Sequence, residues 1–141
     1  MTLHLIKLCV GAPTIEALTE WRARRIAEGR GRTDGLNYHR TRMMPKRHQE
    51  IVAQGSLYWV MSGMVRCRQI IAALEPGVDS EGRGYCEILM HPRIIPVTPQ
   101  PKRPFQGWRY LEEKDAPDDL EPGSEAPEGD MADTLARMGL I

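Results

Sequence analysis

Arginine is the residue type in this sequence that is best suited to chemistry with a charged ligand. It supplies 15 of the 19 basic residues, and its planar guanidinium matches the oxygens of phosphate and carboxylate. Nine basic residues fall between positions 22 and 47, opposed only by Glu28 and Asp34: Arg22, Arg24, Arg25, Arg30, Arg32, Arg40, Arg42, Lys46 and Arg47. Several cations on one surface attract a phosphate backbone. A solvated basic face, or pairing with the protein's own acids, is the alternative.

Aromatic residues give the second chemical pattern, because rings beside arginine stack on the bases of single-stranded RNA. Trp59 and Trp108 are the candidate stacking residues, with Arg109 beside the second. The phosphate contacts that we predict are Arg40, Arg42, Lys46, Arg47, Arg66 and Arg68. Packing in the core is the alternative for each ring. The sequence therefore predicts a small module that binds RNA or another nucleic acid.

Catalytic and metal chemistry have weaker support. His39 and His48 are candidates for acid–base work in a small hydrolase or nuclease, but nothing in the sequence fixes their geometry. The three cysteines, Cys9, Cys67 and Cys86, are not at metal-binding spacing and are typical of buried apolar positions. P-loop, dinucleotide-binding and zinc-protease motifs are lacking. We therefore predict no catalytic residue, no metal and no cofactor, and a binding module rather than an enzyme.

The net charge of zero hides a division along the chain. Residues 1–110 hold 17 basic and 9 acidic residues, whereas residues 111–141 hold 2 basic and 10 acidic residues. We expect the acidic tail to compete with nucleic acid for the basic body. Met131, Leu135 and Met138 have helical spacing, so the segment Met131–Ile141 is an alternative docking helix for a protein partner.

Hydrophobic patterning predicts the elements that position these residues. Leu3–Val10 is apolar on both faces and predicts a central strand. Thr14 suits the N-cap of a helix reaching about Glu28, with apolar residues near one face at Ile15, Leu18, Trp21 and Ile26. A short helix is predicted at 46–54, a polar loop at 76–84, and further strands at 56–61, 64–74, 85–90 and 94–97.

These elements predict one α+β domain over residues 1–111, built on a mixed or antiparallel, barrel-like sheet with flanking helices. Residues 112–130 are acidic, rich in Pro and Gly and without aromatics, which predicts a disordered linker. Residues 131–141 follow as a short amphipathic helix. The start of the chain lacks the pattern of a secretory signal, and no stretch is apolar enough to span a bilayer. We therefore expect a cytoplasmic protein with no membrane contact.

Four blocks carry a resemblance to a known family: residues 40–47 (RTRMMPKR), 55–60 (GSLYWV), 63–69 (GMVRCRQ) and 101–111 (PKRPFQGWRYL). In these blocks the chain resembles a bacterial domain-of-unknown-function family found mainly in Alphaproteobacteria. The resemblance covers most of residues 1–111 and leaves the acidic tail outside. It implies no activity, cofactor or catalytic residue.

A looser resemblance is to PUA-like domains, including the ASCH and EVE branches. It depends on the order of a basic segment, a short helix, the strand at 56–61, a turn and a strand with basic residues. It implies a small mixed β-barrel of a kind often linked to RNA or modified bases. The ASCH pocket motif is not cleanly present, and Thr41 with Arg42 and Lys46 is its nearest counterpart.

Overall fold

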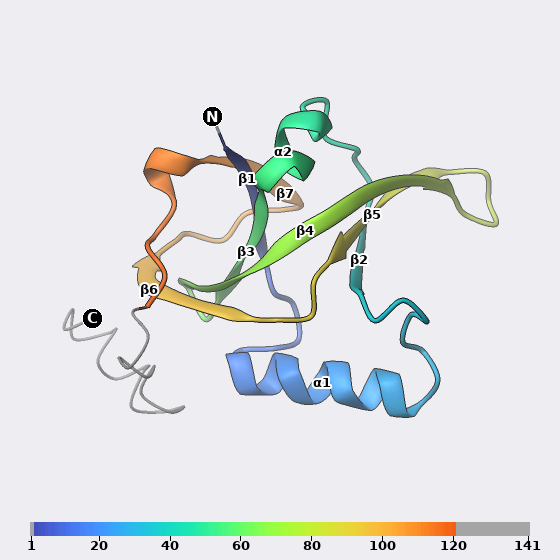
Figure 1. The fold of residues 1–141 in the computed structure, drawn as a ribbon, viewed down its shortest axis with the longest axis horizontal. Coiled ribbons are helices and arrows are strands. Elements are labelled where there is room, and N and C mark those ends of the chain that lie inside the picture. Colours follow the sequence, from blue (N-terminus) through green and yellow to red (C-terminus); the bar gives the residue numbers. More distant parts are fainter. Residues whose placement is uncertain (1, 121–141) are drawn as a thin grey trace.

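Strand β1 (Leu3–Leu8) lies inside a seven-stranded mixed sheet in the computed structural model, which describes residues 2–120 (Figure 1). Its neighbours are the parallel strand β3 (Ser56–Met61) and the antiparallel strand β7 (Trp108–Glu112). Its first four residues are buried. The prediction of a central strand with two apolar faces is therefore confirmed.

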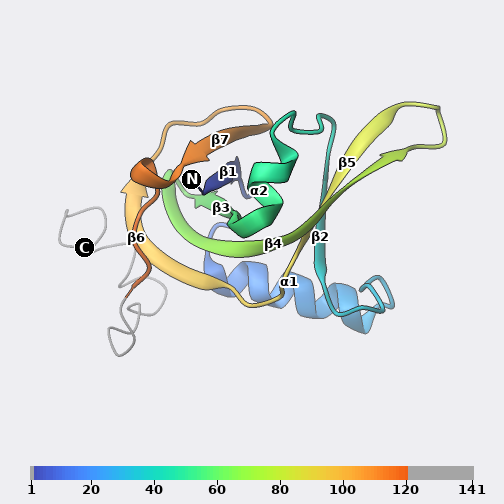
Figure 2. The ribbon, with the colours of Figure 1, turned by 45° about the horizontal axis from the view of Figure 1, so that its top comes forward.

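Strand β4 (Met64–Val78) joins the two halves of the sheet. Its first half pairs with β3 and with β6 (Ile95–Pro101), and its second half pairs with β5 (Gly84–Met90). Strand β2 (Asn37–Thr41) adds to the far side of β5. The register shifts at several points along β4, and Figure 2 shows how strongly the strand curves. The polar loop predicted at 76–84 is shorter than expected because β4 continues to Val78.

The predicted closure into a barrel is wrong. The strand order is β2-β5-β4-β3-β1-β7, with β6 attached to β4, so β2 and β7 end the order without pairing with each other. Within the described residues that follow β7, 113–120, strand β6 pairs at one isolated bridge, between Val97 and Asp119. Hydrophobic alternation specifies which face of a strand is buried, but it does not specify whether the first and last strands meet.

Two helices complete the fold. Helix α1 (Ile15–Ala27) begins after Thr14, whose hydroxyl accepts a hydrogen bond from the Ala17 amide at 3.1 Å. This cap is the predicted one. Helix α2 (His48–Gln54) ends at Gly55, where a Cβ would clash with the backbone carbonyl of Leu3. The glycine thus lets the end of α2 lie directly against β1.

The sheet buries both of its faces, and strand β3 shows how. Leu57, Trp59 and Met61 enter the larger core, which also contains Leu18 of α1 and Ile51 of α2. Tyr58 and Val60 enter a second core on the opposite face, together with Ile6, Val65, Val97, Phe105 and Leu111. This period-2 alternation fixes the register of β3, because a one-residue slip would exchange the two faces.

The packed body extends beyond the boundary predicted at residue 111. Strand β7 ends at Glu112, and a 3₁₀ turn, η1 (Glu113–Asp115), follows it. Further on, Asp119 forms two hydrogen bonds of 2.8 Å with the Arg68 guanidinium. The first part of the predicted disordered linker is therefore attached to the sheet.

The predicted helix at 131–141 lies outside the described residues. None of the described helices is long and apolar enough to cross a membrane.

Candidate ligand-binding site

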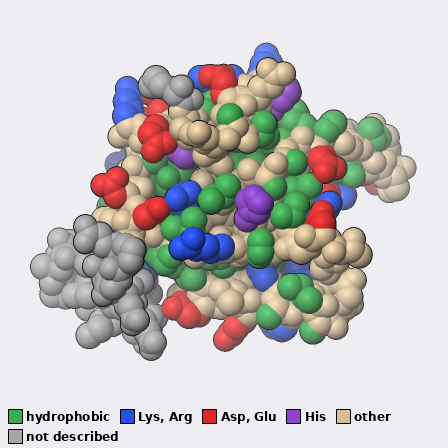
Figure 3. All heavy atoms as spheres, in the orientation of Figure 1, with side chains coloured by type: hydrophobic (Ala, Val, Ile, Leu, Met, Phe, Trp, Pro, Cys, Tyr) green, Lys and Arg blue, Asp and Glu red, His purple; other side chains and the backbone are tan. Residues whose placement is uncertain are grey.

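The predicted phosphate-binding arginines are mostly engaged with carboxylates of the protein itself. Four of them form ion pairs, listed with the shortest N–O distance: Arg40–Glu87 at 3.2 Å, Arg42–Asp79 at 2.9 Å, Arg47–Glu50 at 2.7 Å and Arg68–Asp119 at 2.8 Å. On the face shown in Figure 3, basic and acidic side chains are interspersed. A phosphate would have to replace an existing partner at each of these positions, which weakens the predicted surface.

The other predicted contact residues lie in different environments. Trp59 is only 2% exposed, so its ring does not lie on the outer surface. Arg66 is also buried. Trp108 donates from its indole nitrogen to the Met43 carbonyl at 2.8 Å. Arg109 is exposed and lies over the ring of Phe105, while Lys46 is exposed.

A cavity of about 180 Å³ lies between α1 and the sheet. We call it the α1 cavity, and its lining consists of Cys9, Val10, Gly11, Ala12, Leu18, Trp21, Arg22, His39 and Trp59. Most of this lining is apolar or aromatic. Arg22 and His39 are the only residues of it with strongly polar side chains, and neither is saturated with hydrogen bonds. A small apolar pocket with a few convergent polar groups is the usual form of a ligand site.

Arg22 takes a place that sequence periodicity assigned to apolar residues. Trp21 and Ile26 were predicted near the buried face of α1, but they are 39% and 62% exposed. Arg22 instead donates from Nη2 to the side-chain oxygen of Gln69 at 3.1 Å. Its Nε and Nη1 atoms are buried and have no hydrogen-bond partner among the described residues. Burial lowers the pKa of Arg22 to about 10, which leaves it charged at neutral pH.

His39 reaches the α1 cavity from β2. Its ring meets that of Trp59 edge-on, with 5.4 Å between the centroids, and its Nε2 atom is buried without a partner among the described residues. Burial, and then the positive charges of Lys7 and Arg22, lower the pKa of His39 to about 4. The ring is therefore neutral at pH 7. A neutral imidazole offers one donor and one acceptor, so His39 can complement either kind of ligand atom.

The electrostatic balance of the α1 cavity is positive. No carboxylate is part of its lining, and burial raises the pKa of the Cys9 thiol to about 11, so that this group is neutral at pH 7. Lys7 lies close enough to affect the pKa of His39. A buried charge without a counter-charge and without full hydrogen bonding is costly. An oxyanion in the cavity would supply both the counter-charge and the missing hydrogen-bond acceptors.

Gln69 does not line the α1 cavity but bonds to two residues that do, Arg22 and Trp59, and it is not among the residues singled out from the sequence. Its side-chain oxygen accepts from Arg22 and from the Trp59 indole nitrogen, at 3.1 and 3.0 Å. Its side-chain nitrogen donates to the Asn37 side chain at 2.8 Å and to the His91 carbonyl at 3.0 Å. The sequence contained a signal for it. In the strand predicted at 64–74, Gln69 has the same alternation as Cys67 and Ile71, so its side chain is expected on the same buried face.

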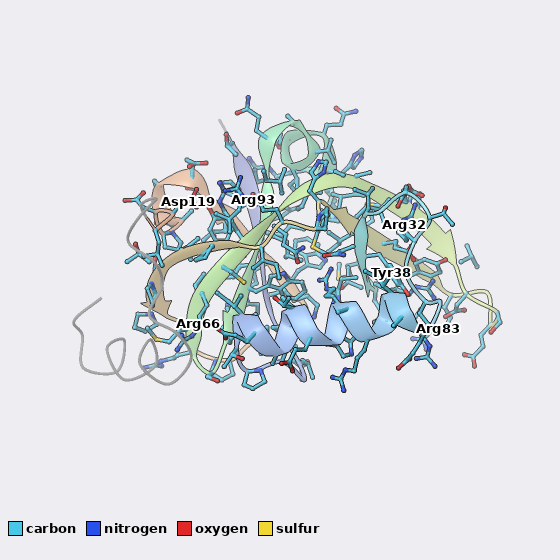
Figure 4. All side chains as sticks on the ribbon, turned by 60° about the horizontal axis from the view of Figure 1, so that its bottom comes forward. Arg32, Tyr38, Arg66, Arg83, Arg93 and Asp119 are labelled. Atoms are coloured by element: carbon cyan, nitrogen blue, oxygen red, sulfur yellow. The ribbon has the colours of Figure 1, made fainter. Side chains whose placement is uncertain are left out.

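A smaller pocket of about 40 Å³ adjoins the α1 cavity and shares Trp21 and Arg22 with it. We call it the arginine pocket after the four arginines in its lining: Arg22, Arg25, Arg30 and Arg32. Arg25 lies over the rings of both Trp21 and Tyr38 and donates to the Tyr38 hydroxyl. Figure 4 shows Tyr38 and Arg32 near the C-terminal end of α1. Four of the nine residues of the predicted basic cluster thus lie around one small pocket.

The burial of His39 predicts a pH dependence of stability. The unfolded chain binds a proton at this residue near pH 6.5, whereas the folded protein does so only near pH 4. Between these values the unfolded state binds more protons, so stability decreases as pH falls from 6.5 to 4. At 1.36 kcal/mol per pKa unit, the loss reaches about 3 kcal/mol. Urea denaturation at each pH measures it, and the decrease should be much smaller in His39→Gln. An unchanged pH profile in that variant would contradict the assignment.

The hydrolase alternative receives no support from the arrangement of the two histidines. His39 lies in the α1 cavity, while His48 is exposed at the start of α2 and is not part of that lining. Within residues 2–120, no group of three or more His, Cys, Asp or Glu side chains is placed to hold a metal ion. Cys67 and Cys86 are buried, and burial raises the pKa of both thiols.

Comparison with known proteins gives one match. Searches of curated proteins and of solved structures found no match, and no comparison supports the looser resemblance to PUA-like domains. The model of DUF1489, described as a protein of unknown function, matches residues 5–141. The match includes the acidic tail, which the sequence analysis wrongly placed outside the resemblance. Because it spans nearly the whole sequence, the chain belongs to the DUF1489 family.

Proposed function

We propose that the protein binds a small planar anion in the α1 cavity. The observation that carries this proposal is the Arg22 guanidinium, which is charged at neutral pH and has two buried nitrogens without a partner among the described residues. Buried polar groups in native proteins are nearly always satisfied, so an exception calls for an occupant. An oxyanion would accept hydrogen bonds from Arg22 and balance its charge.

The size and walls of the α1 cavity support a ring as the body of this ligand. A dry cavity of about 150 Å³ is large enough to hold benzene, and the α1 cavity has about 180 Å³. Trp59 and Leu18 offer apolar surfaces, while Arg22 provides a charged end. The ligand class that fits is therefore a single aromatic ring carrying an anionic or strongly accepting oxygen.

Benzoate is the probe for this proposal, and the indole N–H signals of the three tryptophans in a ¹H–¹⁵N spectrum provide the measurement. The Trp21 and Trp59 signals should shift with benzoate, with a Kd of about 1 mM or tighter, equivalent to roughly −4 kcal/mol. The Trp108 signal should not move, because Trp108 does not line the α1 cavity. Benzamidine has the same ring and a positive charge, and it should not bind. Equal shifts with both compounds, or with neither, would overturn the proposal.

Nucleic-acid binding is the second candidate function, at cations of the predicted basic cluster other than the six predicted phosphate contacts. The observation that favours it is a pair of exposed cations on and after α1, Arg24 and Arg30, beside the partly exposed ring of Trp21 and the half-buried Arg25. Binding of a short RNA that weakens steeply with salt would support it. Docking of a protein partner through residues 131–141 stays a prediction, because that segment lies outside the described residues.

A further inference from the structure

We infer that the α1 cavity takes up its anion together with a proton, which His39 holds in the complex. This inference rests on the proposed function and adds the proton linkage of the same site. Its basis is that Arg22 and His39 come from two different elements, line one cavity, and each have buried nitrogens without a partner among residues 2–120. No carboxylate of the described chain lines this cavity. The site thus lacks the negative charge that an anion would bring.

The charges that act on His39 in the free protein are all positive. Burial lowers the pKa of His39, and the positive charges of Lys7 on β1 and Arg22 on α1 lower it further. The other groups around the ring carry no charge at pH 7. Trp59 meets it edge-on, Ile88 is its partner on β5, and the Cys9 thiol in the same lining is neutral. The free protein therefore keeps the imidazole neutral.

An anion bound to Arg22 reverses the electrostatic part of this effect. An oxygen that accepts from the unpartnered Nε or Nη1 atom of Arg22 lies beside the charge that now opposes protonation of His39. A nearby negative charge favours the imidazolium. Further burial by the ligand has little effect, because the His39 Nε2 atom is already buried. The anion therefore raises the pKa of His39, and the protonated ring has a donor at each nitrogen.

The sign of the resulting pH dependence follows from linkage. If the anion strengthens the binding of a proton to His39, the proton strengthens the binding of the anion by the same factor. Affinity for the anion should therefore increase as pH falls from 7.5 toward the pKa of about 4 that His39 has in the free protein. Ionisation of the ligand alone gives the opposite direction, because an acid loses its charge as pH falls.

Isothermal titration of the full chain with benzoate at pH 5.5, 6.5 and 7.5 tests this inference. At each pH, two buffers with different ionisation enthalpies give the number of protons taken up per benzoate. We expect binding at least about 3-fold tighter at pH 5.5 than at pH 7.5, with roughly half a proton or more taken up at pH 5.5 and almost none at pH 7.5. The ordinary pKa of a carboxyl group is about 4, so benzoate stays mostly ionised in this range.

Two histidine variants separate His39 from the other titratable groups. Glutamine keeps a donor and an acceptor but does not titrate, so His39→Gln should bind benzoate with nearly the same affinity at pH 5.5 and pH 7.5. His48 is exposed at the start of α2 and does not line the α1 cavity, so His48→Gln should keep the pH dependence of the natural protein. An NMR titration of the His39 ring gives a direct readout without a variant. Its midpoint should move to higher pH with saturating benzoate.

The outcomes distinguish this inference from the proposed function. If benzoate binds equally well at all three pH values, if the pH dependence persists in His39→Gln, or if the His39 midpoint does not move, the inference is wrong and the proposed function stands. If benzoate binds at none of the three pH values, both are wrong.

Discussion

Replacing Arg22 by methionine should weaken ligand binding strongly while leaving the free protein as stable as before, or more stable. Methionine keeps much of the volume but removes the charge and the donors, so the affinity for benzoate should fall about 100-fold. The free protein loses one hydrogen bond to Gln69 and is relieved of a buried charge with two unpartnered nitrogens. Removing such a charge in favour of an apolar side chain is often neutral or stabilising, here by up to about 1 kcal/mol. Urea denaturation and titration with benzoate measure the two effects.

The same substitution at Arg24 is the matched control. Arg24 lies on the same helix, is exposed and lines neither the α1 cavity nor the arginine pocket, so Arg24→Met should change stability by no more than about 0.5 kcal/mol and leave benzoate binding intact. A large loss of stability in Arg22→Met would instead mean that Arg22 holds the fold together. Unchanged binding in Arg22→Met would refute the proposed site.

This combination of effects separates a binding residue from a structural one. A residue that serves only the fold decreases stability when it is removed. A residue kept for a ligand can cost stability in the free protein, and its removal then improves the fold at the expense of function. Arg22 has the properties of the second kind, because its helix position is one that an apolar residue would fill more favourably. Saturating ligand should stabilise the natural protein and not the variant.

Most of the fold could be predicted from local sequence signals. Thr14 marks the start of α1, and the composition of residues 56–61 predicts strand β3 with its observed bounds. That the sheet stays open could not be predicted, because closure depends on the curvature of β4 and on where β6 and β7 end. The contact of residues 112–120 with the sheet could not be predicted for a related reason. Local acidity predicted disorder, but Asp119 is held by Arg68, a residue far away in the sequence.

The candidate site was predictable only in part. The basic cluster from Arg22 to Arg47 was visible in the sequence, but the carboxylates that neutralise several of its members lie on other elements. Glu87 of β5, for example, pairs with both Arg32 and Arg40. Arg22 remains unsatisfied because its surroundings are Trp59, His39 and Leu18 rather than an acid. Which arginine is left without a carboxylate is decided by long-range pairing, which a single sequence does not reveal.

Replacing Gln69 by leucine should destabilise the protein severely. Gln69 is fully buried, and its amide makes four hydrogen bonds, to the Trp59 indole, Arg22, Asn37 and the His91 carbonyl. Leucine satisfies none of these groups, and each group left buried without a partner costs about 1–3 kcal/mol. Even if half of them reach water, the free energy of unfolding should fall by about 4 kcal/mol. Urea denaturation monitored by circular dichroism measures the loss.

The same substitution at Gln100 shows whether the loss comes from the network or from the change of residue type. Gln100 also lies on a strand, β6, but it is exposed, so Gln100→Leu should alter stability by no more than about 0.5 kcal/mol. A small effect at Gln69 would contradict the network, because it would mean that the four partners find others at little cost. The double variant Gln69→Leu with Arg22→Met gives a sharper test. It removes one of the stranded partners together with its charge, so it should be more stable than Gln69→Leu alone.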